Sequence, residues 1–282
     1  MRAVIIYVAA PYLAVIVIFT VFQRRLIYQP ERSEGLARNE ADFLPHSRKA
    51  VALPVDGGLI LNGWLIRSNH PIAESERWLA IYFPGNSGHR DVRRRDLLEV
   101  ADAGFDVLIF DYRGYGDNPG SPSERALTAD ARAIWEEATR QRGYSAGRIL
   151  LFGESLGGAV AIALCADVCK AGEVPAGLTV VSSFSSLPDV AASLYPAFPF
   201  RFLLFDRYDA ASRIADIRCP IAIIHGEADD IVPSELGRRL FDAAPTASAD
   251  GVPKQWELVL RMGHNDVPQQ QLSTTLRNMA GE

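Results

Sequence analysis

The chain has 282 residues, of which 48% are hydrophobic and 22% are charged, and its formal net charge is −5. This length suits one large α/β domain or at most two small ones, and the composition is that of a globular protein that buries a full core. The negative net charge provides no basic field for nucleic acid, so we expect no nucleic-acid partner.

The three cysteines are an odd number and do not form a disulfide framework. Cys165 and Cys169 fall on one face of a predicted helix and are interpreted as buried structural thiols. The sequence contains no CxxC or HExxH pattern. It therefore gives no support for a metal site, and no cofactor is expected.

An apolar run without a charge occupies residues 3–22. Its length of about twenty residues is what a helix needs to cross a bilayer core, and it has no polar face. No small-x-small cleavage site follows it, so residues 1–25 are predicted to be an uncleaved membrane anchor rather than a signal peptide or a core helix. More arginines follow the run than precede it, which favours a cytoplasmic catalytic domain. Those that follow are Arg24, Arg25, Arg32 and Arg38.

Residues 26–50 are polar and irregular and are predicted to form a linker to a catalytic domain at 51–282. A Gly-containing turn at 56–58 predicts an opening antiparallel hairpin. Strands and helices then alternate, which implies a mainly parallel, eight-stranded sheet with helices on both faces. The predicted strands are 51–54, 61–67, 78–83, 107–110, 149–152, 178–181, 221–224 and 256–260. The predicted helices are 91–103, 121–142 with a capping box at its start, 156–169, 234–243 and 267–279.

An insertion at about 187–216 is too long for a plain connection between a strand and a helix, and it is rich in aromatic residues. Two interpretations remain open. The insertion is either a short lid whose side chains line a pocket for an apolar acyl or alkyl group, or an extra helix in the core. As a lid, it would place Tyr195, Phe198 and Phe202 in the substrate pocket.

A Gly153-x-Ser155-x-Gly157 pattern lies between a predicted strand and a predicted helix. In a nucleophile elbow the serine occupies a strained turn, and the residues two before and two after it must be small. The helix N-terminus then directs backbone N–H groups, including that of Leu156, at an oxyanion formed there. The alternative is a Gly-rich turn whose serine caps the helix. The position between strand and helix favours a nucleophile.

A base and an acid must follow the serine in the order that this elbow requires. His225 and His264 are the histidines after Ser155, and His264 is preferred because it lies in a loop between the last strand and the last helix. His225 ends a strand and is expected to shape the next loop by hydrogen bonds. Asp229 is the preferred acid, to accept the N–H of His264. Glu227 and Asp230 are the other candidates, and Asp230 fits a helix cap better.

The loop after the predicted strand at 78–83 reads Pro84-Gly85-Asn86-Ser87. A second oxyanion donor belongs on this loop, and the backbone N–H of Asn86 is the natural partner for that of Leu156. The alternative is a simple Pro-Gly turn.

Together these motifs resemble the α/β-hydrolase superfamily, and in particular the Bem46-like and ABHD13/ABHD17-like membrane-anchored serine hydrolases, also labelled serine aminopeptidase-like. They are Gln23 to Pro30, Phe83 to Asn86, Asp111 to Gly116, Gly153 to Gly158, Arg207 to Asp209, His225 to Pro233 and Gly263 to Asp266. The resemblance implies a triad of Ser155, Asp229 and His264. The family usually has histidine before the loop glycine, where this chain has Pro84. Because the donor is a backbone N–H further on, we expect the oxyanion hole to survive.

The expected activity is hydrolysis of a carboxylic ester or thioester of a lipid-like or acylated substrate by an anchored serine hydrolase. The expected partners are that substrate and, through the N-terminal helix, a membrane. Two other hypotheses remain. The chain is a serine peptidase, as the aminopeptidase label suggests, or a catalytically silent membrane-anchored binding scaffold.

Overall fold

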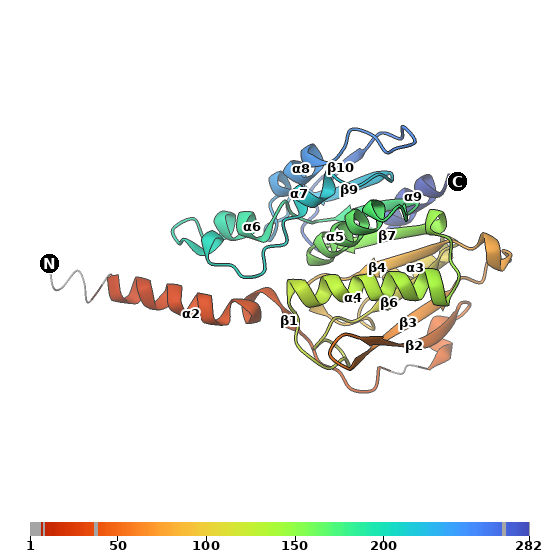
Figure 1. The fold of residues 1–282 in the computed structure, drawn as a ribbon, viewed down its shortest axis with the longest axis horizontal. Helices are drawn as coiled ribbons and strands as arrows, with labels where there is room; N and C mark the ends of the chain where they lie inside the picture. Colours follow the sequence, from red (N-terminus) through yellow and green to blue (C-terminus); the bar gives the residue numbers. More distant parts are fainter. Residues whose placement is uncertain (1–6, 8, 37–38, 267–268, 282) are drawn as a thin grey trace.

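The computed structural model describes residues 7, 9–36, 39–266 and 269–281. Its centre is an eight-stranded sheet in the order β10-β9-β8-β7-β4-β6-β3-β2 (Figure 1). Strand β3 pairs antiparallel with β2 and with β6, and all other neighbouring pairs in this sheet are parallel. The strands are β2 (Ser47–Val55), β3 (Leu59–Arg67), β4 (Leu79–Phe83), β6 (Asp106–Phe110), β7 (Ile149–Glu154), β8 (Gly177–Val181), β9 (Ile221–Gly226) and β10 (Gln255–Val259). The predicted mostly parallel sheet is confirmed.

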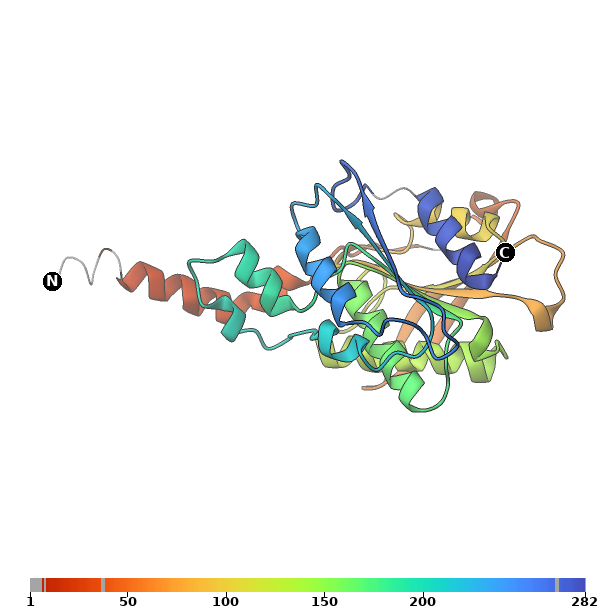
Figure 2. The same ribbon diagram turned by 90° about the horizontal axis from the view of Figure 1, so that it is seen from above.

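Helices cover both faces of this sheet (Figure 2). One face carries α4 (Glu124–Glu136), α5 (Leu156–Lys170), α7 (Ala210–Ile214) and α8 (Ser234–Ala243). The other carries α3 (Arg94–Asp102) and α9 (Gln269–Ala280). Side chains alternate across a strand, so each face of the sheet has its own cluster of buried apolar residues.

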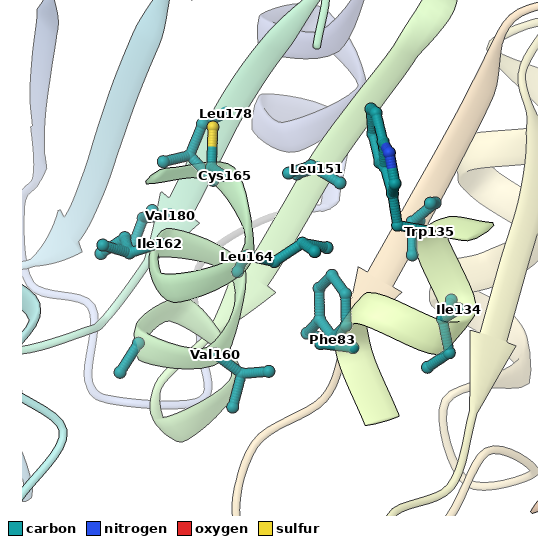
Figure 3. Packing of buried hydrophobic residues seen from close by; sticks show 14 of the residues in the cluster. Phe83, Ile134, Trp135, Leu151, Val160, Ile162, Leu164, Cys165, Leu178 and Val180 are labelled. Atoms are coloured by element: carbon teal, nitrogen blue, oxygen red, sulfur yellow. The ribbon is translucent and has the colours of Figure 1, made fainter. Parts of the chain in front are cut away.

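Helix α5 lies deepest of these helices and is buried along almost its whole length. Figure 3 shows Val160 and Leu164 of α5 beside Phe83 of β4 and Leu151 of β7, with Trp135 of α4 next to them. A helix that is apolar all round belongs in the interior. Because α5 is packed on all sides, it fixes the position of Ser155 at the helix N-terminus.

The start of α4 differs from the expected capping box. Ser123, not Ser121, is the N-cap, and its Oγ accepts a hydrogen bond of 3.2 Å from the N–H of Ala126. The backbone of Ser123 is extended, as an N-cap requires. The α-helix also ends earlier than predicted, at Glu136, and a π-helical turn at Glu137–Gln141 follows it.

An apolar helix, α2 (Ala10–Ile27), projects from the body of the protein at the N-terminal end (Figure 1). Its mean hydropathy is 1.5 and only 11% of it is buried, so it is not a core helix. By length and composition it is a candidate membrane span. It runs past the predicted end of the anchor at residue 25. The first residues of the predicted anchor, 1–6 and 8, lie outside the described part of the chain.

The linker expected at residues 26–50 is a packed segment in the structure. Tyr28, Leu36 and Phe43 in it are buried. A two-stranded parallel pair joins β1 (Gln29–Pro30) to β5 (Ser87–Gly88). The large apolar side chains of residues 26–50 are spaced too irregularly to indicate a helix or a strand. They are buried by contacts with distant parts of the chain, which the polar composition of the segment does not reveal.

The insertion contains α6 (Leu187–Leu194), a 3-10 turn at Phe200–Phe202 and α7. Its first part lies side by side with α2 in both ribbon views (Figures 1 and 2). The rings of Phe19 and Phe200 stack with centroids 3.7 Å apart. A small separate apolar cluster therefore joins the insertion to α2, so this part is not an extra helix in the core of the sheet.

Candidate active site

Ser155 joins β7 to α5 in a strained conformation. Its φ is 51° and its ψ is −116°, a region that residues with a side chain rarely adopt. The turn closes because its neighbours are glycines: a Cβ on Gly157 would overlap the carbonyl oxygens of Phe83 and Pro84, and one on Gly153 would meet the backbone of Gly157. The predicted strand-turn-helix is present, and it projects Ser155 from the carboxyl edge of the sheet.

His264 lies against Ser155. Its Nε2 is 3.0 Å from Ser155 Oγ, and its Nδ1 is 2.7 Å from Asp229 Oδ2. The three residues come from the ends of β7, β9 and β10, which are strands of one parallel sheet. The structure thus brings together the three residues expected as nucleophile, acid and base. With a proton on Nδ1 donated to Asp229, Nε2 accepts the hydroxyl proton of Ser155.

The Asp229 carboxylate is fully buried and saturated with donors. Besides His264 on Oδ2, its Oδ1 accepts the N–H groups of Ile231 at 3.1 Å and Val232 at 2.8 Å. Burial alone would raise the pKa of Asp229, but hydrogen bonds from His225, His264 and the Val232 N–H outweigh it and hold this pKa well below its usual range. Asp229 is therefore ionised at any working pH and fixes the orientation of His264.

His225 has the structural role expected of it, and Asp230 does not. His225 is fully buried, and its Nε2 lies 2.8 Å from the carbonyl oxygen of Val232 and 3.2 Å from Asp229 Oδ2. It thus orders the loop that carries the acid, as expected. Asp230 does not cap α8, because that helix has Pro233 at its N-cap and no side-chain cap bond. Asp229 itself accepts the N–H groups of this turn.

The loop at residues 84–88, called the 84–88 loop from here on, is held from three sides. The hydroxyl of Tyr112 donates to the Pro84 carbonyl and that of Tyr115 to the Asn86 carbonyl, both at 2.8 Å. The Asn86 side chain donates to the Ile27 carbonyl at 2.9 Å. Both tyrosines belong to the motif from Asp111 to Gly116, but these hydrogen bonds could not be predicted from the sequence. Pro84 fits this loop, where its carbonyl rather than an N–H is used.

An ion pair links the 84–88 loop to the elbow. Arg93 donates to Glu154, the residue before Ser155, at 2.8 Å, and to the Ser87 carbonyl at 3.1 Å. The hydroxyl of Tyr82 also donates to Glu154, at 2.6 Å. No spacing rule connects an arginine near the start of α3 to a residue of the elbow, so the sequence analysis did not find this contact.

A cavity of about 250 Å³ opens beside Ser155. Asn86 and Leu156, the expected oxyanion donors, line it together with Ser155. Of the three aromatic residues expected in the pocket, Tyr195 lines the cavity but Phe198 and Phe202 do not. Phe198 stacks on Tyr12 of α2 with centroids 5.1 Å apart, and Phe202 is exposed. That expectation needs correction for Phe198 and Phe202, because the first ring packs on α2 and the second is exposed to solvent.

The cavity wall is mainly apolar, and much of it comes from two helices. Helix α6 contributes Leu187, Val190, Ala191 and Leu194, and helix α2 contributes Phe19, Leu26 and Ile27. The sequence analysis assigned no pocket residue to either set. The only sequence signal for α2 is that its apolar run leads straight into the resemblance motif at Gln23 to Pro30.

Three thiols gather elsewhere in the protein. The sulfur atoms of Cys165, Cys169 and Cys219 lie within 4.8 Å of one another, and all three residues are buried. Among the described residues this is the one group with the composition of a metal site. Cys165 lies ten residues along α5 from Ser155, about 15 Å at 1.5 Å per residue. The cluster therefore plays no part in the arrangement around Ser155.

Comparisons with known proteins show which proteins this chain resembles. A family model described as serine aminopeptidase, S33, matches residues 74–199. The uncharacterised protein Rv2307c of Mycobacterium tuberculosis is 41% identical over 244 residues, which cover 86% of this chain and 81% of that protein. A lysophosphatidylserine lipase, ABHD12 of Danio rerio, is 33% identical over 66% of this chain. The chain spans 50% of the length of that lipase.

Solved structures show the same fold. The esterase Pf2001 of Pyrococcus furiosus superimposes with a TM-score of 0.66 at 18% identity. The match covers 90% of this chain and 97% of the esterase. At this low identity the likeness concerns the fold.

Proposed function

The chain belongs to the α/β-hydrolase superfamily, and from this premise we propose that it is a serine hydrolase that cleaves a carboxylic ester or thioester. The observation that carries the proposal is the hydrogen-bonded series from Ser155 through His264 to Asp229. Nucleophile, base and orienting acid lie within hydrogen-bond reach of one another, which is the arrangement that activates a serine hydroxyl.

The reaction proceeds in two stages. Ser155 Oγ attacks the acyl carbonyl carbon while His264 Nε2 takes its proton, and the N–H groups of Asn86 and Leu156 stabilise the oxyanion. The tetrahedral intermediate collapses, the bond to the alcohol or thiol leaving group breaks, and His264 returns the proton to that group. Water, deprotonated by His264, then attacks the acyl carbonyl, the bond to Ser155 Oγ breaks, and His264 returns the proton to Ser155 as the acid leaves.

An acylated or lipid-like substrate fits this site best. The cavity beside Ser155 is lined mainly by aliphatic and aromatic side chains, and α2 is a candidate membrane span. Relatives at 33% identity are named lysophosphatidylserine lipases. We propose an anchor that ends near Ile27 and a catalytic domain from about residue 51 that contains the insertion. By the positive-inside rule, Arg24 and Arg25 in the last turn of α2 favour a cytoplasmic position for that domain.

The aminopeptidase label of the matching family model raises a peptidase as a second candidate. An aminopeptidase holds the free amine of its substrate with a carboxylate. Among the described residues that line the cavity none is acidic, so the site favours an ester. Comparable rates on an amino-acyl amide and on an ester would reverse this preference.

Hydrolysis of a panel of p-nitrophenyl esters tests the proposed function. The full chain in detergent is expected to hydrolyse at least one of them, and Ser155→Ala is expected to lose that activity. Equal rates in the two proteins would contradict the proposal.

A further inference from the structure

Part of the cavity wall beside Ser155 comes from the candidate membrane helix itself. Phe19, Leu26 and Ile27 lie on α2 at positions i, i+7 and i+8, so they share one face of the helix. This face lines the same cavity as Ser155. A helix that only tethered a domain would not need to reach its active site.

Polar contacts fix this face of α2 in place. Gln23 is fully buried: its Nε2 donates to the Leu203 carbonyl at 3.1 Å, and its Oε1 accepts the Phe205 N–H at 2.7 Å. Arg24 forms a two-pronged ion pair with Asp206, at 2.9 and 3.2 Å. These bonds connect positions about 180 residues apart, so the part of α2 that lines the cavity is held in place by the tertiary structure.

The cavity runs from a buried polar end to an exposed apolar rim. Ser155 at the inner end is 9% exposed. Leu26, Leu194 and Tyr195 also line the cavity but are 55%, 43% and 47% exposed. Exposed apolar side chains next to a span are suited to contact with lipid rather than water. The cavity mouth therefore faces the region where α2 would enter a bilayer.

We propose that α2 is a component of the active site as well as an anchor, and that Phe19, Leu26 and Ile27 form one wall of a subsite for a single acyl chain that enters from the membrane. The inference rests on the proposed function. The cavity of about 250 Å³ holds roughly eight water-sized groups at ~30 Å³ each, which matches a medium-length acyl chain. With the ester carbonyl at Ser155, the acyl chain then extends along the cavity towards its exposed rim.

Substitutions on α2 that change acyl-chain selectivity test the proposal. Leu26→Trp introduces bulk at the cavity mouth, and Val21→Trp introduces it at an exposed position of the same helix that does not line the cavity. Rates on p-nitrophenyl butyrate, octanoate and dodecanoate are measured on the full chain in detergent. In Leu26→Trp, the ratio of kcat/KM for octanoate to that for butyrate is expected to fall at least fivefold. In Val21→Trp it is expected to stay at the wild-type value.

A second pair of variants removes bulk instead. Phe19→Ala widens the cavity, while Phe22→Ala removes an equal ring from a position that does not line it. The ratio for dodecanoate to butyrate is expected to rise at least threefold in Phe19→Ala only. This ratio compares two substrates of one protein, so a general loss of stability does not move it.

Labelling with a small fluorophosphonate separates failure of this inference from failure of the proposed function. If wild type and variants label equally and all selectivity ratios match, the proposed acyl-chain subsite on α2 is refuted, while the proposed serine hydrolase activity is not. If wild type itself does not label, the proposed function is wrong. A Leu26→Trp protein that does not label has either a blocked cavity or a disturbed fold, and Phe19→Ala then decides the outcome.

Discussion

The side-chain amide of Asn86 donates a 2.9 Å hydrogen bond to the carbonyl of Ile27, the last residue of α2. The Gln29 N–H returns a bond of 3.0 Å to the Asn86 carbonyl. The loop that would supply an oxyanion donor is thus tied to the segment that leaves the candidate membrane helix. Helix α2, the 84–88 loop and the elbow that carries Ser155 form one connected structure.

Asp229→Asn is expected to lower kcat on the order of 10³- to 10⁴-fold with little change in fold, because an amide does not stabilise the His264 imidazolium or fix its tautomer. Steady-state hydrolysis of the best p-nitrophenyl ester measures this loss. Asp230→Asn is the matched control, since Asp230 is exposed and makes no cap to α8. Equal losses in both variants would remove Asp229 from its proposed role.

The depressed pKa of Asp229 predicts a pH dependence of stability. A carboxylate whose folded pKa lies below its unfolded value stabilises the fold above the unfolded pKa, about 3.9 for aspartate, and loses this contribution as pH falls towards the folded pKa. The difference in Tm between wild type and Asp229→Asn is therefore expected to be constant above about pH 5 and to shrink below about pH 4. Thermal unfolding from pH 7 to pH 2.5 measures it. A constant difference over that whole range would show that the buried hydrogen bonds do not depress the pKa.

Tyr115→Phe is expected to lower kcat about tenfold and stability by about 1 kcal/mol, because it removes one hydrogen bond to the 84–88 loop. Tyr144→Phe is the matched control: it removes a buried tyrosine hydroxyl bonded to Asp106, far along the chain from this loop. A comparable loss of stability with unchanged kcat is expected there. If both variants lose kcat equally, the effect of Tyr115 on activity does not depend on its hydrogen bond to the 84–88 loop.

Gln23→Leu is expected to loosen the insertion from α2. The change leaves the Phe205 N–H and the Leu203 carbonyl without their partner, at a cost of about 1–3 kcal/mol. Cleavage within residues 195–206 by limited proteolysis is expected to accelerate. Phe22→Leu, on the exposed side of the same helix, serves as the control. Unchanged cleavage in Gln23→Leu would mean that the apolar stacking alone holds the insertion.

The fold and the grouping of Ser155, Asp229 and His264 could be predicted because local sequence patterns indicate them directly. Each of these residues follows a short apolar strand, and the carboxyl ends of parallel strands meet at one edge of a sheet. Chain order limits the base to His225 and His264, and the position of His264 in the loop between the last strand and the last helix distinguishes it from His225. The glycines at 153 and 157 are required by the close contacts of the turn.

The contacts of α2 could not be predicted in this way. Arg24 and Asp206 are 182 positions apart, and no periodicity connects them. The aromatic residues of the insertion indicate burial or a pocket, but not which ring faces which surface. The rings of Phe198 and Phe200 pack on α2, and the wall of the cavity comes largely from other residues of α6 and α2.

Covalent labelling of Ser155 tests the central claim most directly. Wild type, Ser155→Ala and His264→Ala are incubated in detergent with a fluorophosphonate and their intact masses are measured. The geometry predicts one adduct on wild type, none on Ser155→Ala and strongly slowed labelling of His264→Ala, because Nε2 of His264 is the base 3.0 Å from the hydroxyl. No adduct on folded wild type, or equal labelling of all three proteins, would contradict an activated serine at this site.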